Sequence, residues 1–360
     1  GEHAPDWKLP YQGKRPRDLY EKEYPVQSKS YAFSEATRHF FTNDKQNPYV
    51  QDDKPFDWVR ADVVGGRSLL WGRQTYRWSE LDFQANALDG HGIPWPIGYK
   101  DLAPWYSHVE RFIGVSGEAM GLDELPDSEF LPAMGTHKLE ETIKGRLKRK
   151  APDIKLTMGR AAILTQDHNG RAACHYCGPC HRGCSTGSYF SSQSSTLPAA
   201  RATGNLTLRP NSVVEKMIYD PAARKVREVR VIDSETGERL AFRSRLVFLC
   251  ASTVASTQLL MNSQSESFTN GLGNHSGALG RYMMDHAHGL AGMGIFLDDM
   301  DSYWYGNRPN GMYIPRFRNL KAKGNENSFV RGYGYQVHAL RMNWQSSFNR
   351  KGFGASLKDS

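Results

Sequence analysis

Hydrophobic side chains recur at three- and four-residue steps in two segments of the chain, and this spacing predicts amphipathic helices. The first segment, Tyr99–Gly114, carries five large apolar residues on this spacing: Leu102, Trp105, Tyr106, Val109 and Phe112. The second segment, Leu139–Lys150, is followed by Pro152, which cannot continue a helix. Shorter helices are predicted at Ser34–Phe41 and Ser191–Thr203.

Strand-forming residues gather in the middle of the chain. Ile154–Leu164 is predicted to be a strand that leads into a cysteine-rich segment. Four short strands separated by turns are predicted after it: Leu206–Leu208, Val213–Tyr219, Val226–Asp233 and Leu240–Phe242. Arg245–Cys250 is an apolar run, predicted to be a buried strand that continues into a helix at Ala251–Asn262. After Gly280, alternating residues and glycines predict a region rich in antiparallel sheet.

This mixture of helices and strands predicts an α/β (α+β) fold. With 360 residues, the chain is long enough for two domains or one large domain. The pattern divides it into an extended, loop-rich arm at residues 1–57, a central domain at 58–286, and the start of a further domain at 287–360. The central domain carries the cysteine-rich insertion near residues 171–187.

Composition excludes several classes of protein. A hydrophobic fraction of 39% argues against disorder, and no apolar run approaches the roughly 18 residues of a membrane span. The chain begins at Gly1, and no signal peptide is visible in it. The net charge of +8 would suit an anionic partner such as a nucleic acid. However, the densest basic run, Lys144–Lys150, ends a predicted helix, where cations are favourable without any ligand, so we expect no nucleic-acid partner.

Two adjacent glycines stand in the segment Val63–Gly72. An apolar pair precedes Gly65 and Gly66, and Ser68, Trp71 and Gly72 follow them. Glycine permits positive φ and close approach of another group to the backbone, so the segment is interpreted as a strand that turns tightly beside a ligand. The glycine pair by itself is equally typical of an ordinary turn.

Four of the five cysteines lie within the eleven residues Cys174–Cys184, with the spacing C-x2-C-x2-C-x3-C. This is the spacing of a bacterial ferredoxin run and favours an iron–sulfur cluster held by Cys174, Cys177, Cys180 and Cys184. A structural zinc site is a second hypothesis, because His175 and His181 lie in the same segment. Two disulfides, or thiols without a metal, are a third. The fifth cysteine, Cys250, is predicted to be a buried core thiol.

The segment Val63–Arg77 resembles the flavin-facing segment of the glucose-methanol-choline (GMC) oxidoreductases. It is most similar to the bacterial branch that contains gluconate, fructose and glucoside dehydrogenases. The resemblance spans roughly residues 45–290 and continues, in the order of that family, through five more segments: His91–Ile97, Leu102–Tyr106, Thr207–Met217, Leu249–Leu260 and Gly280–His286.

The resemblance implies an FAD-binding, Rossmann-like domain followed by part of an antiparallel-sheet substrate domain. Five residues would line the isoalloxazine ring and its phosphate side: Gly65, Gly66, Ser68, Trp71 and Gly72. Val213 or Val214 would contact the adenine through its backbone, and Ala251 and Ser252 would face the dinucleotide. The predicted helix N-terminus after Ser252 agrees with the last role, because such ends present free N–H groups to phosphate. A plain helix cap is the structural alternative for these two residues.

The resemblance also implies a function. The protein would be an FAD-dependent dehydrogenase that transfers hydride from a CH–OH group of a sugar or alcohol to the flavin. Electrons would then leave through a [3Fe–4S] or [4Fe–4S] cluster to a cytochrome c or a quinone. The triplet Cys174, Cys180 and Cys184 matches the C-x5-C-x3-C spacing of a [3Fe–4S] site in such enzymes. A small subunit and a periplasmic or membrane-associated location are further expectations.

Two alternatives remain open at this point. One is a GMC oxidase without a cluster, and the other is a zinc-stabilised, basic nucleic-acid-binding module. His286 matches a position of the family near the edge of the flavin domain, where a structural role is expected. Four aromatic residues are candidates to stack on a sugar ring, with core packing as the competing role: Trp71, Trp304, Tyr305 and Trp344.

Two parts of the family pattern are missing from these residues. No Gly-x-Gly-x-x-Gly turn, which seats the FAD pyrophosphate, follows an N-terminal strand. The C-terminal segment that supplies a paired His and His or Asn to the reaction is also missing. The chain is therefore expected to be a fragment that binds FAD weakly by itself and contains no catalytic residue.

Overall fold

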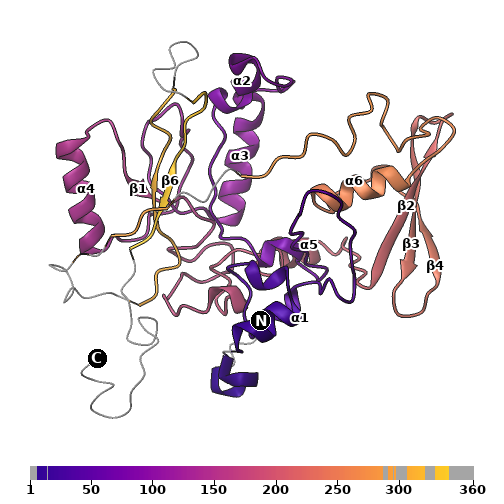
Figure 1. Ribbon diagram of the computed structural model, residues 1–360, viewed down its shortest axis with the longest axis horizontal. Helices are drawn as coiled ribbons and strands as arrows, with labels where there is room; N and C mark the ends of the chain where they lie inside the picture. Colours follow the sequence, from indigo (N-terminus) through magenta and orange to yellow (C-terminus); the bar gives the residue numbers. More distant parts are fainter. Residues whose placement is uncertain are drawn as a thin grey trace. The chain divides into compact units, whose positions relative to one another are not determined.

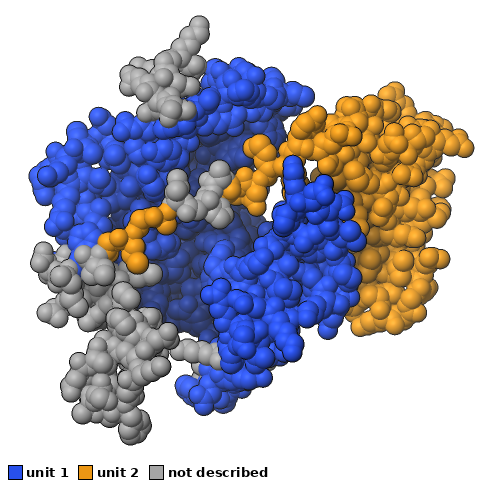
Figure 2. Space-filling model, in the orientation of Figure 1, with its two compact units in different colours: residues 1–205, 295–360 blue, residues 206–294 orange. Residues whose placement is uncertain are grey.

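The computed structural model describes residues 6–13, 15–286, 291–294, 296, 306–320 and 329–339. The chain forms two compact units, one of residues Gly1–Asn205 with Ile295–Ser360 and one of Leu206–Gly294 (Figure 2). Each unit is described by itself. The predicted domain boundaries after residues 57 and 286 are not tested by this division into compact units, so they stay predictions.

The described residues of the first unit form the α-helices α1 (Arg17–Glu23), α2 (Glu80–Asp89), α3 (Tyr99–Ile113), α4 (Lys138–Lys150) and α5 (Thr196–Ala202) (Figure 1). Short 3-10 helices precede α1, namely η1 (Asp6–Lys8) and η2 (Pro10–Gly13), and others lie between the α-helices: η3 (Gln27–Lys29), η4 (Arg38–Phe40), η5 (Gly66–Leu69) and η6 (Cys180–Arg182). The arm at the start of the chain thus has more helix than its sequence predicts.

The two long helices predicted from hydrophobic spacing are confirmed by α3 and α4. Helix α4 ends on three basic residues, as the charge of a helix C-terminus favours. The predicted helix Ser34–Phe41 is only the 3-10 turn η4. The helix predicted over Ser191–Thr203 is shorter, because Ser191 and Ser194 bond to each other through backbone and hydroxyl groups and hold a turn before α5.

Helix α3 buries a different face from the predicted one. Trp105, Val109 and Phe112 are exposed, whereas Glu110 and Ile113 are buried. The reason is a buried ion pair between Glu110 and Arg77, which places the polar side of the helix against the body of the unit. The apolar periodicity predicted the helix correctly but not its orientation.

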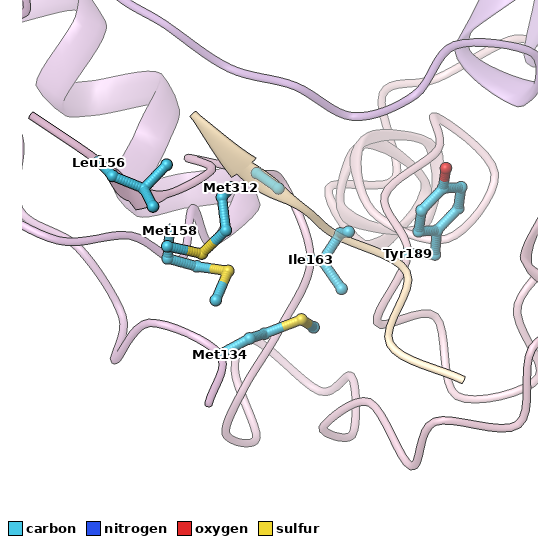
Figure 3. Packing of buried hydrophobic residues seen from close by; sticks show 7 residues of the cluster. Met134, Leu156, Met158, Ile163, Tyr189 and Met312 are labelled. Carbon is cyan, nitrogen blue, oxygen red and sulfur yellow. The ribbon is translucent and has the colours of Figure 1, made fainter. Parts of the chain in front are cut away.

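The sheet of the first unit is antiparallel, with the strand order β1 (Thr157–Met158), β5 (Met312–Ile314) and β6 (Tyr335–Val337). Its core contains Met134, Leu156, Met158, Ala161, Ile163, Tyr189 and Met312. In Figure 3, Ile163 lies between the methionine side chains and Tyr189. The predicted strand Ile154–Leu164 is reduced to β1, although Ala161–Leu164 are fully buried and bond to loops instead.

The second unit is a three-stranded antiparallel meander, β2 (Ser212–Asp220), β3 (Lys225–Asp233) and β4 (Arg239–Phe242). Helix α6 (Thr253–Asn262) packs on β2, and the Met217 N–H donates to Ser263 Oγ at 2.9 Å (Figure 1). These elements confirm the predicted strands and helix of this region, except that Leu206–Leu208 forms no strand.

The predicted buried strand Arg245–Cys250 is wrong for the described residues. The segment pairs with no strand there, and Leu246 and Phe248 are 74% and 82% exposed. Cys250 is likewise exposed rather than a core thiol. An apolar run becomes a buried strand only when neighbouring strands cover it, and β2–β4 end before this segment.

The mixed α/β class is confirmed, and β5 and β6 confirm antiparallel pairing after Gly280. Among the described residues both sheets are antiparallel, so the Rossmann-like arrangement stays a prediction. Trp304, Tyr305 and Trp344 lie outside the described residues.

Candidate functional site

The predicted tight turn is present at the two adjacent glycines. Gly65 and Gly66 have φ of 99° and 49°, in the region that favours glycine, and the Gly66 N–H donates to Val63 O at 2.7 Å. A side chain at Gly65 would stand 3.1 Å from Gln193 Cγ, whereas the space beside Gly66 is open apart from Ala61 O at 3.8 Å. The turn therefore presents bare backbone at Gly66.

A second segment of the chain braces this turn. Ser68 Oγ donates to Gly65 O at 2.5 Å and accepts from the Ser192 N–H at 3.0 Å. Gln193 Nε2 donates to Val64 O at 2.5 Å. Ser68 and Gln193 thus fix the turn against a segment more than 120 positions away. Gly72 belongs to the same segment. A Cβ built on Gly72 would stand 3.6 Å from the Tyr31 hydroxyl oxygen.

Trp71 follows the glycine turn in the sequence and packs against the core. Its ring meets Phe190 edge-on with 6.1 Å between centroids and packs against the cluster of Ile113, Val115 and Ala162. Its indole Nε1 is buried and has no hydrogen-bond partner among the described residues. A buried donor without an acceptor costs free energy, so this N–H is available to a bound group.

The four clustered cysteines line one small cavity. Its remaining walls are His175, Pro179, Thr186, Ser188, Tyr189 and Pro309. Cys174, Cys180 and Cys184 are half-buried against the core of the first unit, and Cys177 is exposed. All five cysteines of the chain are free thiols, so the disulfide hypothesis finds no support.

Distant parts of the first unit hold the cysteine loop in place. The Cys174 N–H donates to Leu164 O at 2.9 Å, at the end of the buried stretch that follows β1. The Asn307 N–H donates to Tyr176 O at 2.8 Å, and Gly306 lies so close to Tyr176 that a Cβ there would meet it at 2.6 Å. The cavity is therefore built by the fold as a whole rather than by a local loop.

The thiols differ in their readiness to ionise. Burial, and then the neighbouring Cys174 and Cys184, raise the pKa of Cys180 to about 12. Burial alone would raise the pKa of Cys184 too, but hydrogen bonds from Thr186 and from nearby backbone N–H groups hold it below its ordinary value. The Cys184 sulfur lies 3.3 Å from Thr186 Oγ1. Burial likewise raises the pKa of Cys174, so a nearby cation or metal would favour the thiolate forms of Cys174 and Cys180.

The donor set matches metal–thiolate chemistry, but the sulfurs do not form a compact single-ion site. Within the described part of the chain, no group of three or more His, Cys, Asp or Glu side chains is arranged to hold one metal ion. Tetrahedral zinc with Zn–S bonds of about 2.3 Å needs sulfurs about 4 Å apart.

Two buried arginines lie beside this cavity, and sequence reasoning missed both. The Arg73 guanidinium stacks 3.9 Å from the ring centroid of Tyr189, which lines the cavity. Arg171 donates to Gly187 O at 3.3 Å, next to the cavity residues Thr186 and Ser188. The sequence could not predict these positions, because arginine is usually exposed and only the folded structure shows that an individual arginine is buried.

The other predicted cofactor residues belong to the second unit. On β2, Val213 is exposed and Val214 half-buried. Ala251 and Ser252 are exposed, and Ser252 precedes α6 with a φ of 66° and no side-chain cap bond. His286 is exposed and lies 3.0 Å from the Asp285 carboxylate. The predicted roles of all these residues toward FAD stay predictions.

Comparison with known proteins identifies a matching family and named dehydrogenases and oxidases that are similar to this chain. Residues 34–288 match the model of the GMC oxidoreductase family. A 2-methyl-1,2-propanediol dehydrogenase of Mycolicibacterium austroafricanum is 28% identical over 76% of this chain and 49% of its own length. Paromamine 6'-oxidase of Streptomyces fradiae is 29% identical over 64% of the chain and 41% of its own length. The fructose dehydrogenase large subunit of Gluconobacter japonicus is 23% identical over 68% and 44%.

The chain spans about half the length of the curated relatives it matches. The matched region includes both the glycine turn and the four clustered cysteines. In the described part of the chain, no helix has the length and apolar character needed to cross a membrane.

Proposed function

The chain belongs to the GMC oxidoreductase family, and from this we propose that it forms part of an FAD-dependent enzyme that oxidises CH–OH groups of a sugar or an alcohol. The observation that carries the proposal is the buried indole N–H of Trp71, which has no partner among the described residues and belongs to the same segment, Val63–Gly72, as the open glycine turn. A flavin ring offers carbonyl and ring-nitrogen acceptors to such a donor. Family membership favours this proposal over a zinc-stabilised nucleic-acid-binding module.

When bound, FAD would supply the acceptor for the hydride of the carbon that carries the hydroxyl. In our proposal the residues of this chain hold and orient it. The turn at Gly65 and Gly66 brings bare backbone against the cofactor, and Trp71 donates its N–H. Ser68 and Gln193 keep the turn rigid, so little conformational entropy is lost on binding. The base that takes the hydroxyl proton is expected in a C-terminal segment, and no residue of this chain is assigned to it.

The test is FAD binding by the Trp71→Phe variant of the full-length protein. This change keeps an aromatic ring in the core but removes the donor, so FAD should bind about tenfold or more weakly, as expected for one lost hydrogen bond in a buried site. Titration followed by flavin fluorescence measures the affinity. Trp105→Phe, on the exposed face of α3, is the matched control and should bind FAD normally.

A stability measurement separates loss of the donor from damage to the fold. Because the Trp71 N–H has no partner among the described residues, its removal should leave the unfolding free energy of the FAD-free chain unchanged or slightly higher. Unaltered FAD affinity in Trp71→Phe would contradict the proposed role of this donor.

The substrate class rests on the relatives. Their names specify 2-methyl-1,2-propanediol, paromamine and fructose. We propose a sugar or a small polyol as the substrate. Steady-state assays with panels of sugars, diols and simple alcohols would test this, and turnover of none of them would contradict it.

We further propose that Cys174, Cys177, Cys180 and Cys184 hold a [3Fe–4S] or [4Fe–4S] cluster, which passes single electrons to a cytochrome c or a quinone. Support comes from the spacing of the four cysteines and from their convergence on one cavity. Such an acceptor would agree with a small partner subunit and with a periplasmic or membrane-associated location, which we also propose.

Cys180→Ser tests the cluster, with Cys250→Ser as the control outside the cavity. Cys180→Ser should lower iron content and abolish reduction of a cytochrome acceptor while substrate still reduces the flavin. Cys250→Ser should change none of these. If the unaltered protein lacks iron and passes electrons to oxygen, the protein is an oxidase without a cluster, in line with the name of one relative.

A further inference from the structure

Buried arginines in this structure fall into two kinds. The described residues include four that are almost fully buried: Arg73, Arg77, Arg160 and Arg171. Arg77 pairs with Glu110 and Arg160 with Asp127, each at 2.5 Å. Arg73 and Arg171 have no carboxylate partner among the described residues. A buried charge without a counter-charge is costly, so these two positions need an explanation.

Arg73 points from the flavin-facing segment toward the cysteines. Its Nε donates to Phe190 O at 2.7 Å, and its Nη1 donates to Trp71 O and Leu69 O. Its guanidinium stacks 3.9 Å over Tyr189, whose ring is a wall of the cavity. It also lies close enough to Cys180 for an electrostatic interaction. All of its contacts are neutral, and they fix its position without compensating its charge.

Arg171 lies beside the same cavity, next to Gly187. It donates to Gly187 O and Ile113 O, and its Nε has no partner among the described residues. Its electrostatic neighbour is Cys184, whose sulfur contacts Thr186 in the cavity wall. The two unpaired cations therefore stand beside two different cysteines of one site.

We propose that Arg73 and Arg171 are the counter-charges of an anionic iron–sulfur group bound by the four cysteines, and that they stabilise its reduced form. Four thiolates make such a group net negative, and reduction adds a further negative charge, so fixed cations nearby raise its reduction potential. This inference rests on the cluster proposed above. It assigns Arg73 a position between the flavin-facing turn and the cluster, where it acts on the potential rather than on the substrate.

The experiment measures the reduction potential of the cluster in the full-length protein by spectroscopic redox titration. Arg73→Gln keeps hydrogen-bond donors but removes the charge, and should lower the potential by about 59 mV or more, a tenfold shift of a one-electron equilibrium. Arg171→Gln should act in the same direction. Arg73→Lys restores the charge and should return the potential toward that of the unaltered protein. Arg149→Gln, on the exposed end of α4, is the control and should leave it unchanged.

A second experiment compares the effect of Arg73→Gln on the unfolding free energy in two backgrounds, so that the inference can be tested even if a variant folds poorly. In a chain with all four cysteines changed to serine, Arg73→Gln removes an uncompensated buried charge and should stabilise the protein or leave its stability unchanged. In the iron-loaded protein the same substitution should destabilise it. Equal effects in the two backgrounds would overturn the inference.

The outcomes distinguish this inference from the proposed function. An iron-free protein would overturn the cluster and, with it, the role of the two arginines. An iron-loaded protein whose potential is the same in Arg73→Gln, Arg171→Gln and the unaltered chain would overturn the counter-charge role alone.

Discussion

The Arg77 guanidinium lies in a buried hydrogen-bond network that orients α3. It pairs with Glu110 and donates to Tyr99, Ser107 and Ser128 at 2.9–3.0 Å. We expect Arg77→Met to destabilise the protein by about 3–5 kcal/mol, because Glu110 would be left as an unpaired buried charge. Chemical denaturation measures the loss.

Glu129→Ala is the matched control for that prediction. Glu129 also pairs with an arginine, Arg111, but both side chains are more than half exposed and 3.5 Å apart. Its removal should cost about 0–1 kcal/mol, because solvent screens surface pairs. Similar losses in both variants would mean that Arg77 and Glu110 are hydrated.

The lowered pKa of the Asp127 carboxyl group predicts that the stability of the protein depends on pH. Burial alone would raise its pKa, but hydrogen bonds from the Met120 and Gly121 N–H groups, together with Arg160, hold the pKa below its ordinary value. A carboxylate with a lowered folded-state pKa stabilises the fold above its unfolded pKa of about 3.9. That stabilisation is lost as the pH falls below about 4 and through the folded-state pKa.

Asp127→Asn should therefore be less stable than the unaltered protein at pH 7, and the difference should shrink as the pH falls below about 4. Unfolding free energies measured by denaturant from pH 7 to pH 2 provide the check. A difference that stays constant over this range would show that Asp127 does not contribute through its charge.

At the scale of elements, the same substitution has opposite effects at two glycines. Gly145 lies inside α4, where a built Cβ has only an ordinary contact of 3.6 Å to Arg149, so Gly145→Ala should stabilise the protein by about 0.5–1 kcal/mol. Gly90 ends α2 with a φ of 70°, so Gly90→Ala should destabilise it by a similar amount. The midpoints of thermal unfolding of the two variants test this prediction. Midpoints that both rise or both fall relative to the unaltered protein would contradict it.

The elements also show what sequence reasoning captures. The spacing of apolar residues predicted α3 and α4, since helix formation depends on local periodicity. It did not predict which face of α3 is buried, because the Arg77–Glu110 pair joins residues 33 positions apart. Similarly, the cysteine spacing predicted that the four thiols share one site, but the unpaired charges of Arg73 and Arg171 depend on contacts that no local pattern encodes.

At the scale of the whole molecule, the apolar segment Arg245–Cys250 is the clearest departure from a well-covered surface. Leu246 and Phe248 are 74% and 82% exposed, although their sequence is that of a covered strand. Unpaired strand-like apolar segments promote association between chains. The described residues include no strand that covers this segment.

The 360-residue chain alone should therefore associate through this segment, and the double variant Leu246→Lys/Phe248→Lys should reduce that association severalfold. Analytical ultracentrifugation and binding of an apolar dye report the change. Because both side chains make few contacts in their unit, the midpoint of unfolding should stay the same. The matched change Val231→Lys, at a buried position of β3, should instead unfold the second unit, because its side chain is 4% exposed. If the double variant unfolds the unit as Val231→Lys does, Leu246 and Phe248 are core residues in solution, and the apolar run would then form the covered strand that its sequence predicts.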